Sequence, residues 1–324
     1  MSRQIDPHAL QDAAMRHFLE VAQTGSVTAA AQRLGVAPSV VSRSIARLER
    51  AMDTLLFERR ARGMRLNSAG ELLAAHARRA WRDVERVVSD IGSLHGLRSG
   101  TVRVASTEGH ASEFLPRLIT EFQRAYRGIR VVLEVCRQAE IPPLLRHGDM
   151  DIGVTLGTSS ERDIRVEWRQ SAPILAVMAP GHALARRRQL SLAQLVGHPL
   201  VLPPTGSTLR QLFEISAARQ GLEWDAALTV NRLDPMLAFA EAGGGVALCG
   251  TLALRARLQA GTLVAIPLRD REMNERHVEV QTLAGRSLPA ACRTFMACLQ
   301  QALQDGDGPP TAASAAAAAH CPPR

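Results

Sequence analysis

Short hydroxyl side chains and arginines recur at helical spacing between Ala37 and Arg50. At about 100° per residue they gather on one side of a helix, and apolar residues stack on the other. The polar set is Ser39, Ser42, Arg43, Ala46, Arg47 and Arg50, and the apolar set is Val41, Ile45, Leu48 and Met52. Hydroxyls can hold phosphates, and a forked guanidinium can reach guanine O6 and N7. This chemistry suits the DNA major groove; the alternative is an amphipathic surface helix with a solvated basic face.

The segments before this helix would position it. A run of apolar residues at helical spacing, from Met15 to Ala22, ends at Gly25, and Thr28–Leu34 predicts a second short helix that Gly35 closes. A short helix, a tight turn and a longer basic helix form a helix-turn-helix, whose last helix enters the major groove. Pro38 suits the first position of that helix, where a missing N–H costs nothing. The candidate DNA contacts here are Ser26, Thr28, Pro38, Ser39, Ser42, Arg43 and Arg47.

A basic segment follows, from Leu56 to Leu66, with arginines on both sides of a glycine turn at Gly63. This pattern predicts a wing. Arg59 and Arg60 could lie in a neighbouring minor groove or along the backbone, where they would add salt-sensitive affinity with little sequence information.

The chain resembles the LysR-type transcriptional regulators. The residues that carry the resemblance are Phe18-Leu19, Gly25-Ser26, Thr28 to Ala31, Leu34-Gly35-Val36, Ser42-Arg43, Ile45, Leu48-Glu49, Leu56 to Arg59 and Leu66 to Gly70. Val40, Ser44 and Met52-Asp53 depart from the family pattern, which puts the base preference in doubt but not the docking.

The resemblance implies a multidomain chain that combines α+β and α/β parts. It has a winged helix-turn-helix, a long dimerisation linker helix and a two-lobed α/β effector domain similar in fold to periplasmic binding proteins. We expect the boundaries to be 1–66 for the DNA-binding domain, 67–99 for the linker helix and hinge, 100–304 for the effector domain and 305–324 for a disordered tail. Within the effector domain, lobe I would take 100–166 and 265–304, and lobe II 167–264.

Composition agrees with a DNA partner. The 324 residues should hold two or three domains, and the net charge of +8 favours an anionic partner. The chain has no lysine, which excludes a Walker A lysine, a Schiff-base lysine and a Ser-x-x-Lys pair. A GC-rich genome would explain the all-arginine usage equally well.

The five cysteines show no Cys-x-x-Cys and no zinc-ligand spacing, so we expect reduced thiols, no metal and no cofactor. Cys292 and Cys298 could form a redox switch, but a separation of six places them on different helix faces. Residues 1–10 lack an apolar core, and no apolar run approaches the ~18 residues of a membrane span. We therefore expect a cytoplasmic protein without membrane contact.

A long helix should follow the wing, with Asn67 or Ser68 as its cap and Glu71 completing a capping box. Its apolar residues alternate steps of three and four, which is a heptad seam. The seam is Leu73, Ala77, Ala80, Val84, Val87, Ile91 and Leu94. In the LysR-type family the corresponding helix pairs with its copy, so we expect a homodimer or homotetramer; packing on the chain's own second domain is the alternative.

Beyond a glycine-rich hinge at 93–100, strands and helices alternate, which indicates parallel sheets with crossover helices. The expected strands are Thr101–Ser106, Ile129–Val135, Met150–Leu156, Ile174–Met178, Leu200–Leu202, Ala227–Val230, Val246–Cys249, Leu263–Leu268 and His277–Leu283. A second region should begin near Trp168. The resemblance implies that the last two strands and a helix from Pro289 to Leu303 return to the first lobe.

Residues just after the strands are rich in hydroxyls, and ligands of open parallel sheets lie beyond those strand ends. Hydroxyls and helix N-termini favour a carboxylate or phosphate, so we expect a small organic acid as effector. The candidate contacts are Ser106, Thr107, Thr155, Thr205, Ser207, Thr208 and Asn231. Helix capping alone is the alternative for each. Arg137, Arg210 and Arg232 could balance a ligand charge, and Gly243 to Gly245 follow a helix, so a C-cap or close backbone approach is expected there.

No nucleophile elbow, zinc-protease motif or telling carboxylate pair occurs, so we expect no enzyme. The sequence therefore predicts a sequence-specific transcription regulator that binds double-stranded DNA and a small molecule, with RNA polymerase as a further partner if it activates. Two alternatives remain: a loosely specific architectural DNA-binding protein, and a solute-binding module without a DNA role.

Overall fold

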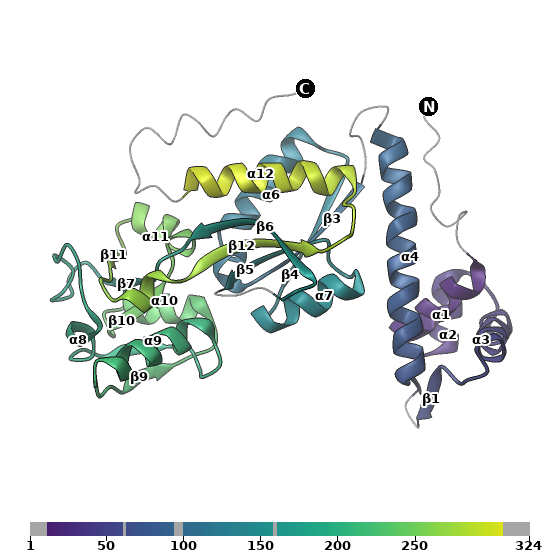
Figure 1. Ribbon diagram of the computed structural model, residues 1–324, viewed down its shortest axis with the longest axis horizontal. Coiled ribbons are helices and arrows are strands. Elements are labelled where there is room, and N and C mark those ends of the chain that lie inside the picture. Colours follow the sequence, from purple (N-terminus) through teal and green to yellow (C-terminus); the bar gives the residue numbers. More distant parts are fainter. Residues whose placement is uncertain (1–11, 61–62, 94–99, 158–160, 307–324) are drawn as a thin grey trace. The chain divides into compact units, whose positions relative to one another are not determined.

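The computed structural model describes residues 12–60, 63–93, 100–157 and 161–306 (Figure 1). Contacts between Cα atoms divide these residues into two compact units. The first takes in the described part of Met1–Ser99 with the short segments Arg146–Asp149 and Leu288–Ala290, and the second takes in the rest.

Three helices form the head of the first unit: α1 (Ala13–Thr24), α2 (Val27–Leu34) and α3 (Pro38–Met52). The side chains of Asp12 and Ser26 accept backbone N–H groups at the starts of α1 and α2, and Pro38 opens α3. Gly25 and Gly35 end the first two helices at φ values of 65° and 67°, which glycine adopts without steric cost. The predicted helix-turn-helix is therefore present, and Gly25, Gly35 and Pro38 lie at the helix ends expected from the sequence.

A two-stranded wing packs on this head. Strand β1 (Phe57–Arg60) pairs antiparallel with β2 (Gly63–Leu66), and the rings of Phe18 and Phe57 lie 5.4 Å apart between centroids. The Met64 N–H donates to the Gly25 carbonyl at 2.8 Å. A Cβ on Gly63 would lie 2.5 Å from that same oxygen, so only glycine lets the wing approach the turn between α1 and α2 this closely.

The long helix α4 (Ser68–Ser93) follows the wing. Its cap is Asn67, whose side-chain oxygen accepts the Gly70 N–H at 2.8 Å; Ser68 lies inside the helix, so the capping box predicted from Ser68 does not form. The predicted seam divides into two parts. Leu73 is buried in the core of the head, whereas Val87 and Ile91 remain 44% and 41% exposed. Leu94, the last seam residue, lies outside the described residues.

The first lobe of the second unit is built on a five-stranded sheet in the order β4-β3-β5-β12-β6. Strands β4, β3 and β5 are parallel, and β12 runs antiparallel to both of its neighbours, so the sheet is mixed rather than wholly parallel. The strands are β3 (Gly100–Ser106), β4 (Ile129–Val135), β5 (Ile152–Gly157), β6 (Ile164–Ser171) and β12 (His277–Leu283).

Helices cover both faces of this sheet. Helices α6 (Phe114–Ala125) and α12 (Ala290–Gly306) lie on one face, where Phe122 meets Phe295 edge-on at 5.1 Å (Figure 1). Helix α7 (Ile141–His147) covers the other face, and two short elements, α5 (Glu108–Ala111) and η2 (Gln138–Glu140), follow strand ends. The disordered tail was predicted to start at Asp305, but α12 runs to Gly306; the rest of that tail, residues 307–324, lies outside the described residues.

The second lobe has its own five-stranded sheet, in the order β11-β7-β10-β8-β9. Its strands are β7 (Leu175–Met178), β8 (Leu200–Leu202), β9 (Ala226–Thr229), β10 (Val246–Cys249) and β11 (Val264–Pro267). Its helices are α8 (Leu192–Leu195), α9 (Thr208–Arg219), α10 (Leu233–Glu241), η3 (Thr251–Ala253), α11 (Arg255–Gln259) and η4 (Arg271–Asn274). Buried residues of α9 and α10 belong to separate clusters, one on each face of the sheet.

Two strand placements differ from the prediction. The strand expected at Leu263–Leu268 was assigned to the first lobe, but β11 pairs with β7 at the edge of the second sheet. The region near Trp168 was expected to start the second lobe, but Trp168 lies in β6 and is paired with Val280 of β12. The chain therefore crosses to the second lobe after Ser171 and returns just before His277. A local apolar pattern identifies a strand but does not determine which sheet edge it joins.

The glycines at Gly243 to Gly245 behave as predicted. Gly243 has a φ of 81° after the end of α10, as a helix-ending residue does, and a Cβ on Gly245 would lie 2.1 Å from the Pro199 carbonyl.

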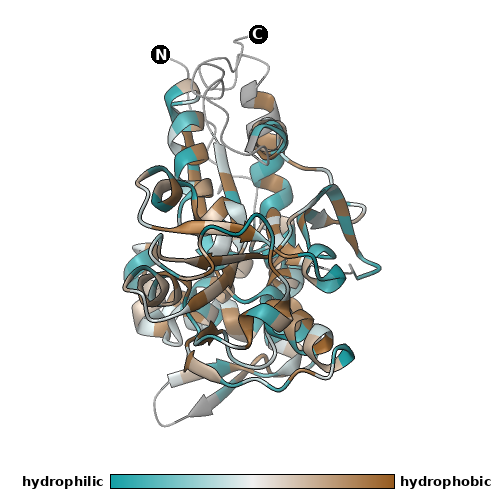
Figure 2. Cartoon of the chain, turned by 90° about the vertical axis from the view of Figure 1, so that its left-hand side faces the viewer, coloured by the Kyte–Doolittle hydropathy of each residue, from teal (hydrophilic) through white to brown (hydrophobic). Residues whose placement is uncertain are grey.

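Hydrophobic residues concentrate on the strands inside the lobes (Figure 2). Within the described residues no helix is long and apolar enough to cross a membrane.

Candidate functional site

The solvent-facing side of α3 carries the predicted DNA contacts. Pro38, Ser39, Ser42, Arg43 and Arg47 are all exposed, and on the opposite side three apolar residues are buried in the head's core. Those three are Val41, Ile45 and Leu48. Met52 was expected on the packing side but is 49% exposed, because it lies in the last turn of the helix, beyond the packed region.

The remaining candidates in the head belong to α2 and the wing. Ser26 accepts the Ala29 N–H at 3.3 Å as the cap of α2, and Thr28, in the first turn, is exposed. The backbones of Arg59 and Arg60 lie in β1, but their side chains lie outside what the structure describes. Ser26 and Thr28 therefore both lie at the N-terminus of α2, where free backbone N–H groups can hold a phosphate.

Arg43 and Arg47, two of the three arginines on the exposed α3 face, differ in their partners. Arg47 donates to both carboxylate oxygens of Asp12, at 3.0 and 2.9 Å, and both side chains are 61% exposed. Arg43 donates from Nε to the Ser39 carbonyl at 3.3 Å, and among the described residues no carboxylate pairs with it. An exposed ion pair is weak and exchanges readily, so both guanidiniums can reach an anionic partner.

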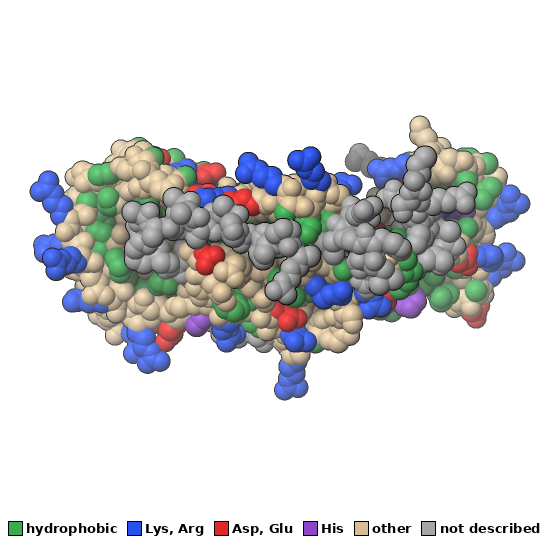
Figure 3. Space-filling model, turned by 90° about the horizontal axis from the view of Figure 1, so that it is seen from above, with side chains coloured by type: hydrophobic (Ala, Val, Ile, Leu, Met, Phe, Trp, Pro, Cys, Tyr) green, Lys and Arg blue, Asp and Glu red, His purple; other side chains and the backbone are tan. Residues whose placement is uncertain are grey.

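Figure 3 shows the Lys and Arg side chains, all of them arginine in this chain, spread singly over the visible face with acidic residues among them. The exposed side of α3 is distinguished by its chemistry, since hydroxyls and guanidiniums share one side of the helix.

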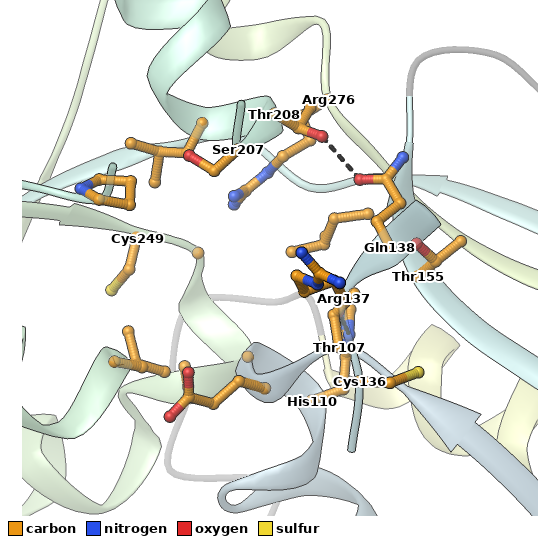
Figure 4. A pocket seen from close by; sticks show the side chains of 18 of the residues that line it. Thr107, His110, Cys136, Arg137, Gln138, Thr155, Ser207, Thr208, Cys249 and Arg276 are labelled. Carbon is orange, nitrogen blue, oxygen red and sulfur yellow. Dashed lines mark hydrogen bonds between the residues drawn. The ribbon is translucent and has the colours of Figure 1, made fainter. Parts of the chain in front are cut away.

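A cavity of about 1120 Å³ lies between the two lobes of the second unit. Six of the seven predicted effector contacts line it, from both lobes (Figure 4): Thr107, Thr155, Thr205, Ser207, Thr208 and Asn231. Ser106 does not. It is fully buried, and its hydroxyl donates to the Thr107 carbonyl at 3.1 Å. Thr107, the first residue after β3, lines the cavity instead.

The hydroxyls in the cavity differ in what they already bond. The Thr155 Oγ1 atom is buried without a hydrogen-bond partner, and Thr155 is only 2% exposed. Thr208 donates to the Gln138 side chain at 2.6 Å, which joins the two lobes across the cavity (Figure 4). Ser207 accepts the Arg210 N–H at 3.2 Å as the cap of α9. Capping therefore accounts for Ser207 but not for Thr155.

The three arginines proposed to balance a ligand charge occupy different settings. Arg137 lines the cavity but is ion-paired with Glu140 at 2.5 Å. Arg210 pairs with Glu214 at 2.7 Å and lies 4.3 Å from the Trp224 ring centre, outside the cavity lining. Arg232 lines the cavity and is exposed.

Sequence reasoning missed a fourth arginine. Arg276 lies just before β12, is buried, and lines the cavity. Two titratable neighbours of Arg276, His110 and Cys249, are uncharged at neutral pH. Burial, and to a smaller extent the charge of Arg276, lower the pKa of His110 to about 3. Burial raises the pKa of Cys249 to about 12. No periodic pattern surrounds Arg276, so only its position in the fold distinguishes it from surface arginines.

Two described residues of the cavity lining, His110 and Cys136, could in principle serve as a base and a nucleophile, but neither is activated. The Thr107 hydroxyl lies 3.3 Å from Nδ1 of His110, but that imidazole is buried, and its low pKa makes it a weak base. Burial also raises the pKa of the Cys136 thiol to about 11, so it is not an activated nucleophile. In the described part of the chain no group of three or more metal-binding side chains gathers. Binding is the chemistry that these residues support.

Known proteins match the chain over both units. The family profile "Bacterial regulatory helix-turn-helix protein, lysR family" matches residues 13–71, and "LysR substrate binding domain" matches residues 95–304. The HTH-type transcriptional regulator YfeR of Shigella flexneri is 29% identical over 240 residues, which cover 74% of this chain and 78% of YfeR.

Solved structures of full length are also similar. A variant of OxyR from Pseudomonas aeruginosa matches with a TM-score of 0.68 at 18% identity, over 90% of this chain and 93% of OxyR. CbnR in complex with its target DNA matches with a TM-score of 0.62 at 18% identity, and the match covers 92% of this chain and 100% of CbnR. At such identities the likeness shows the fold alone.

Proposed function

Since the chain belongs to the lysR family of bacterial helix-turn-helix regulatory proteins, we propose that it controls transcription from a specific operator in response to a small organic acid. The observation that carries the DNA half is the exposed side of α3. It presents Ser39, Ser42 and Arg43 together, which is a set of phosphate and base-edge donors on a helix that the head's core holds rigidly.

The effector half is supported by the cavity between the lobes. Six hydroxyl or amide side chains from a strand, loops and helix starts of both lobes line it, and the buried Thr155 hydroxyl has no partner. Buried polar groups are normally hydrogen-bonded, so an unpartnered one inside a cavity favours a ligand that completes its bonding. Apolar residues also line the cavity, among them Ile164, Met236 and Leu248, and they suit the carbon skeleton of an organic acid.

The mechanism we propose is a population shift in a cytoplasmic homodimer or homotetramer. Two heads on paired α4 helices bind two half-sites, and the high effective concentration multiplies the modest affinity of a single head. An effector that binds one arrangement of the lobes more tightly shifts the assembly toward it and changes how the heads engage DNA. If the regulator acts as an activator, RNA polymerase is a further partner.

The test is an anisotropy titration of the purified protein on DNA from upstream of its own gene, with random DNA as competitor at matched salt. A specific regulator should prefer its operator by roughly 4 kcal/mol or more. The titration is then repeated with a panel of organic acids. Weak binding that is equal on both DNAs and is lost at moderate salt would favour an architectural role. Acid binding without any DNA binding would favour a solute-binding module.

A further inference from the structure

Arg276 is a buried cation on the wall of the cavity. Only 3% of its surface is exposed, and its guanidinium points into the cavity (Figure 4). Its Nε donates to the Ala172 carbonyl at 3.0 Å, but its Nη2 is buried without a hydrogen-bond partner. Among the residues that the structure describes, no carboxylate pairs with it.

The surroundings leave this charge uncompensated. Burial lowers the pKa of Arg276 to about 10, so the side chain is still charged at neutral pH. His110 and Cys249, the titratable groups that interact with it, are both uncharged there because burial shifts their pKa values away from neutral pH. A buried charge without a counter-charge costs free energy, and an anion in the cavity would offset that cost.

The position of the guanidinium is fixed on two sides. A Cβ on Gly250 would lie 2.6 Å from Nη2, so the glycine provides the space that the guanidinium occupies. On the other side, the Arg276 carbonyl accepts the Ala172 N–H at 2.8 Å, in addition to the bond from its own Nε. Ala172 lies in the connection that leaves β6 for the second lobe, and Arg276 lies in the connection that returns to β12. Arg276 therefore ties together the two segments that join the lobes.

We propose that Arg276 selects an anionic effector by donating hydrogen bonds to its carboxylate inside the cavity, and that it thereby places the ligand's charge directly on the hinge between the lobes. This inference rests on the proposed effector role of the cavity and deepens it. A planar carboxylate matches the fork of guanidinium donors, which a neutral amide does not, so charge rather than shape would decide which ligand binds. Arg276 thus acts as the specificity-determining residue.

The test compares acids with their neutral isosteres on the full chain. Acetate, succinate and benzoate, and the corresponding amides, are titrated at constant ionic strength while the Tm and the binding affinity are measured. At least one acid should raise the Tm of the unmodified chain, and its amide should not. Arg276→Gln should lower the affinity for that acid by about 10- to 100-fold, since the bond lost is charge-assisted. Arg276→Lys should retain part of it.

Arg271→Gln is the matched control. Arg271 is 80% exposed and pairs with Glu275 on the surface, so its loss should leave the preference for the acid unchanged. Should Arg276→Gln fail to fold, Gly250→Ala displaces the guanidinium without removing it and should weaken the same acid. No rise in Tm with any of the three acids, or equal effects of acid and amide, would overturn the inference.

DNA titrations on the same preparations separate this inference from the proposed function. Specific DNA binding that responds to a neutral molecule, and not to any acid, would leave the regulator intact and remove the role of Arg276. An acid preference that depends on Arg276 in a chain without specific DNA binding would support the anion site and remove the proposed function.

Discussion

Arg43 and Arg47 lie one helical turn apart on α3, yet only Arg47 has a carboxylate partner in the described chain. Arg43 is therefore better placed to reach a base edge. We predict that Arg43→Ala weakens binding to the operator by ~1–3 kcal/mol and binding to random DNA by less. Fluorescence anisotropy at matched salt measures both. Arg124→Ala, which removes an exposed arginine from α6, should change neither; equal losses on both DNAs would make Arg43 a phosphate contact only.

Asp12 restrains the other arginine. Asn caps a helix about as well as Asp does, so Asp12→Asn keeps the start of α1 while it removes the negative charge beside Arg47. We predict that DNA affinity rises roughly two- to fivefold on any sequence, because an exposed ion pair contributes at most about 1 kcal/mol. The dependence of affinity on salt should steepen as Arg47 becomes free to contact a phosphate. An unchanged affinity and salt slope would mean that Arg47 does not approach the DNA.

His110 predicts an acid sensitivity of the two-lobed unit. Its pKa is lowered from 6.5 to about 3 on folding, chiefly by burial. As the pH falls, the unfolded chain therefore binds a proton at His110 before the folded chain does. The stability that the neutral imidazole contributes is complete above pH 6.5 and is lost as the pH falls from 6.5 toward 3, by up to about 1.4 kcal/mol per unit. Urea unfolding at several pH values should show a steeper decline for the unmodified chain than for His110→Gln. Parallel curves would contradict this.

At the scale of elements, α4 combines two roles along its length. Its first turns complete the core of the head through Leu73, and its later turns leave Val87 and Ile91 exposed. We predict that Val87→Arg shifts the assembly toward monomers, because a charge on a pairing surface opposes its burial, and that it leaves the unfolding of the head unchanged. Sedimentation velocity measures the first effect and thermal unfolding the second.

Leu73→Ala is the contrasting variant on the same helix. It should cost about 2–5 kcal/mol of stability through the cavity it leaves, with little change in assembly at temperatures where the head is folded. If Val87→Arg left the oligomer intact, the pairing surface would lie elsewhere on the chain.

For the whole molecule, the question is whether the cavity and the head communicate. Thr155→Val replaces an unpartnered buried hydroxyl with a methyl group of similar size, so we expect the fold to lose no stability and to gain up to about 1 kcal/mol. The variant should bind operator DNA as before and lose the response to the effector. Titrating DNA with and without the acid found in the panel measures both properties. A full response in Thr155→Val would remove Thr155 from the effector site.

The sequence was sufficient for what depends on neighbours along the chain. Helix ends at Gly25 and Gly35, Pro38 at the start of α3 and the exposed face of α3 all follow from spacing and residue type, because a helix repeats every 3.6 residues. Six of the seven effector candidates line one cavity, because ligand sites of open sheets lie beyond the strand ends.

Only the tertiary structure decided what depends on distant segments. It placed β11 in the second sheet, turned Ser106 away from the cavity and brought Arg276 beside Ala172, more than a hundred residues earlier. No local pattern could reveal these pairings, since an arginine near a strand is ordinarily solvated and an apolar strand fits more than one sheet edge. The sequence by itself therefore determined most elements and the exposed, arginine-bearing side of α3. The fold decided which strand joins which sheet and which charge is buried, because burial and pairing are properties of the packed chain.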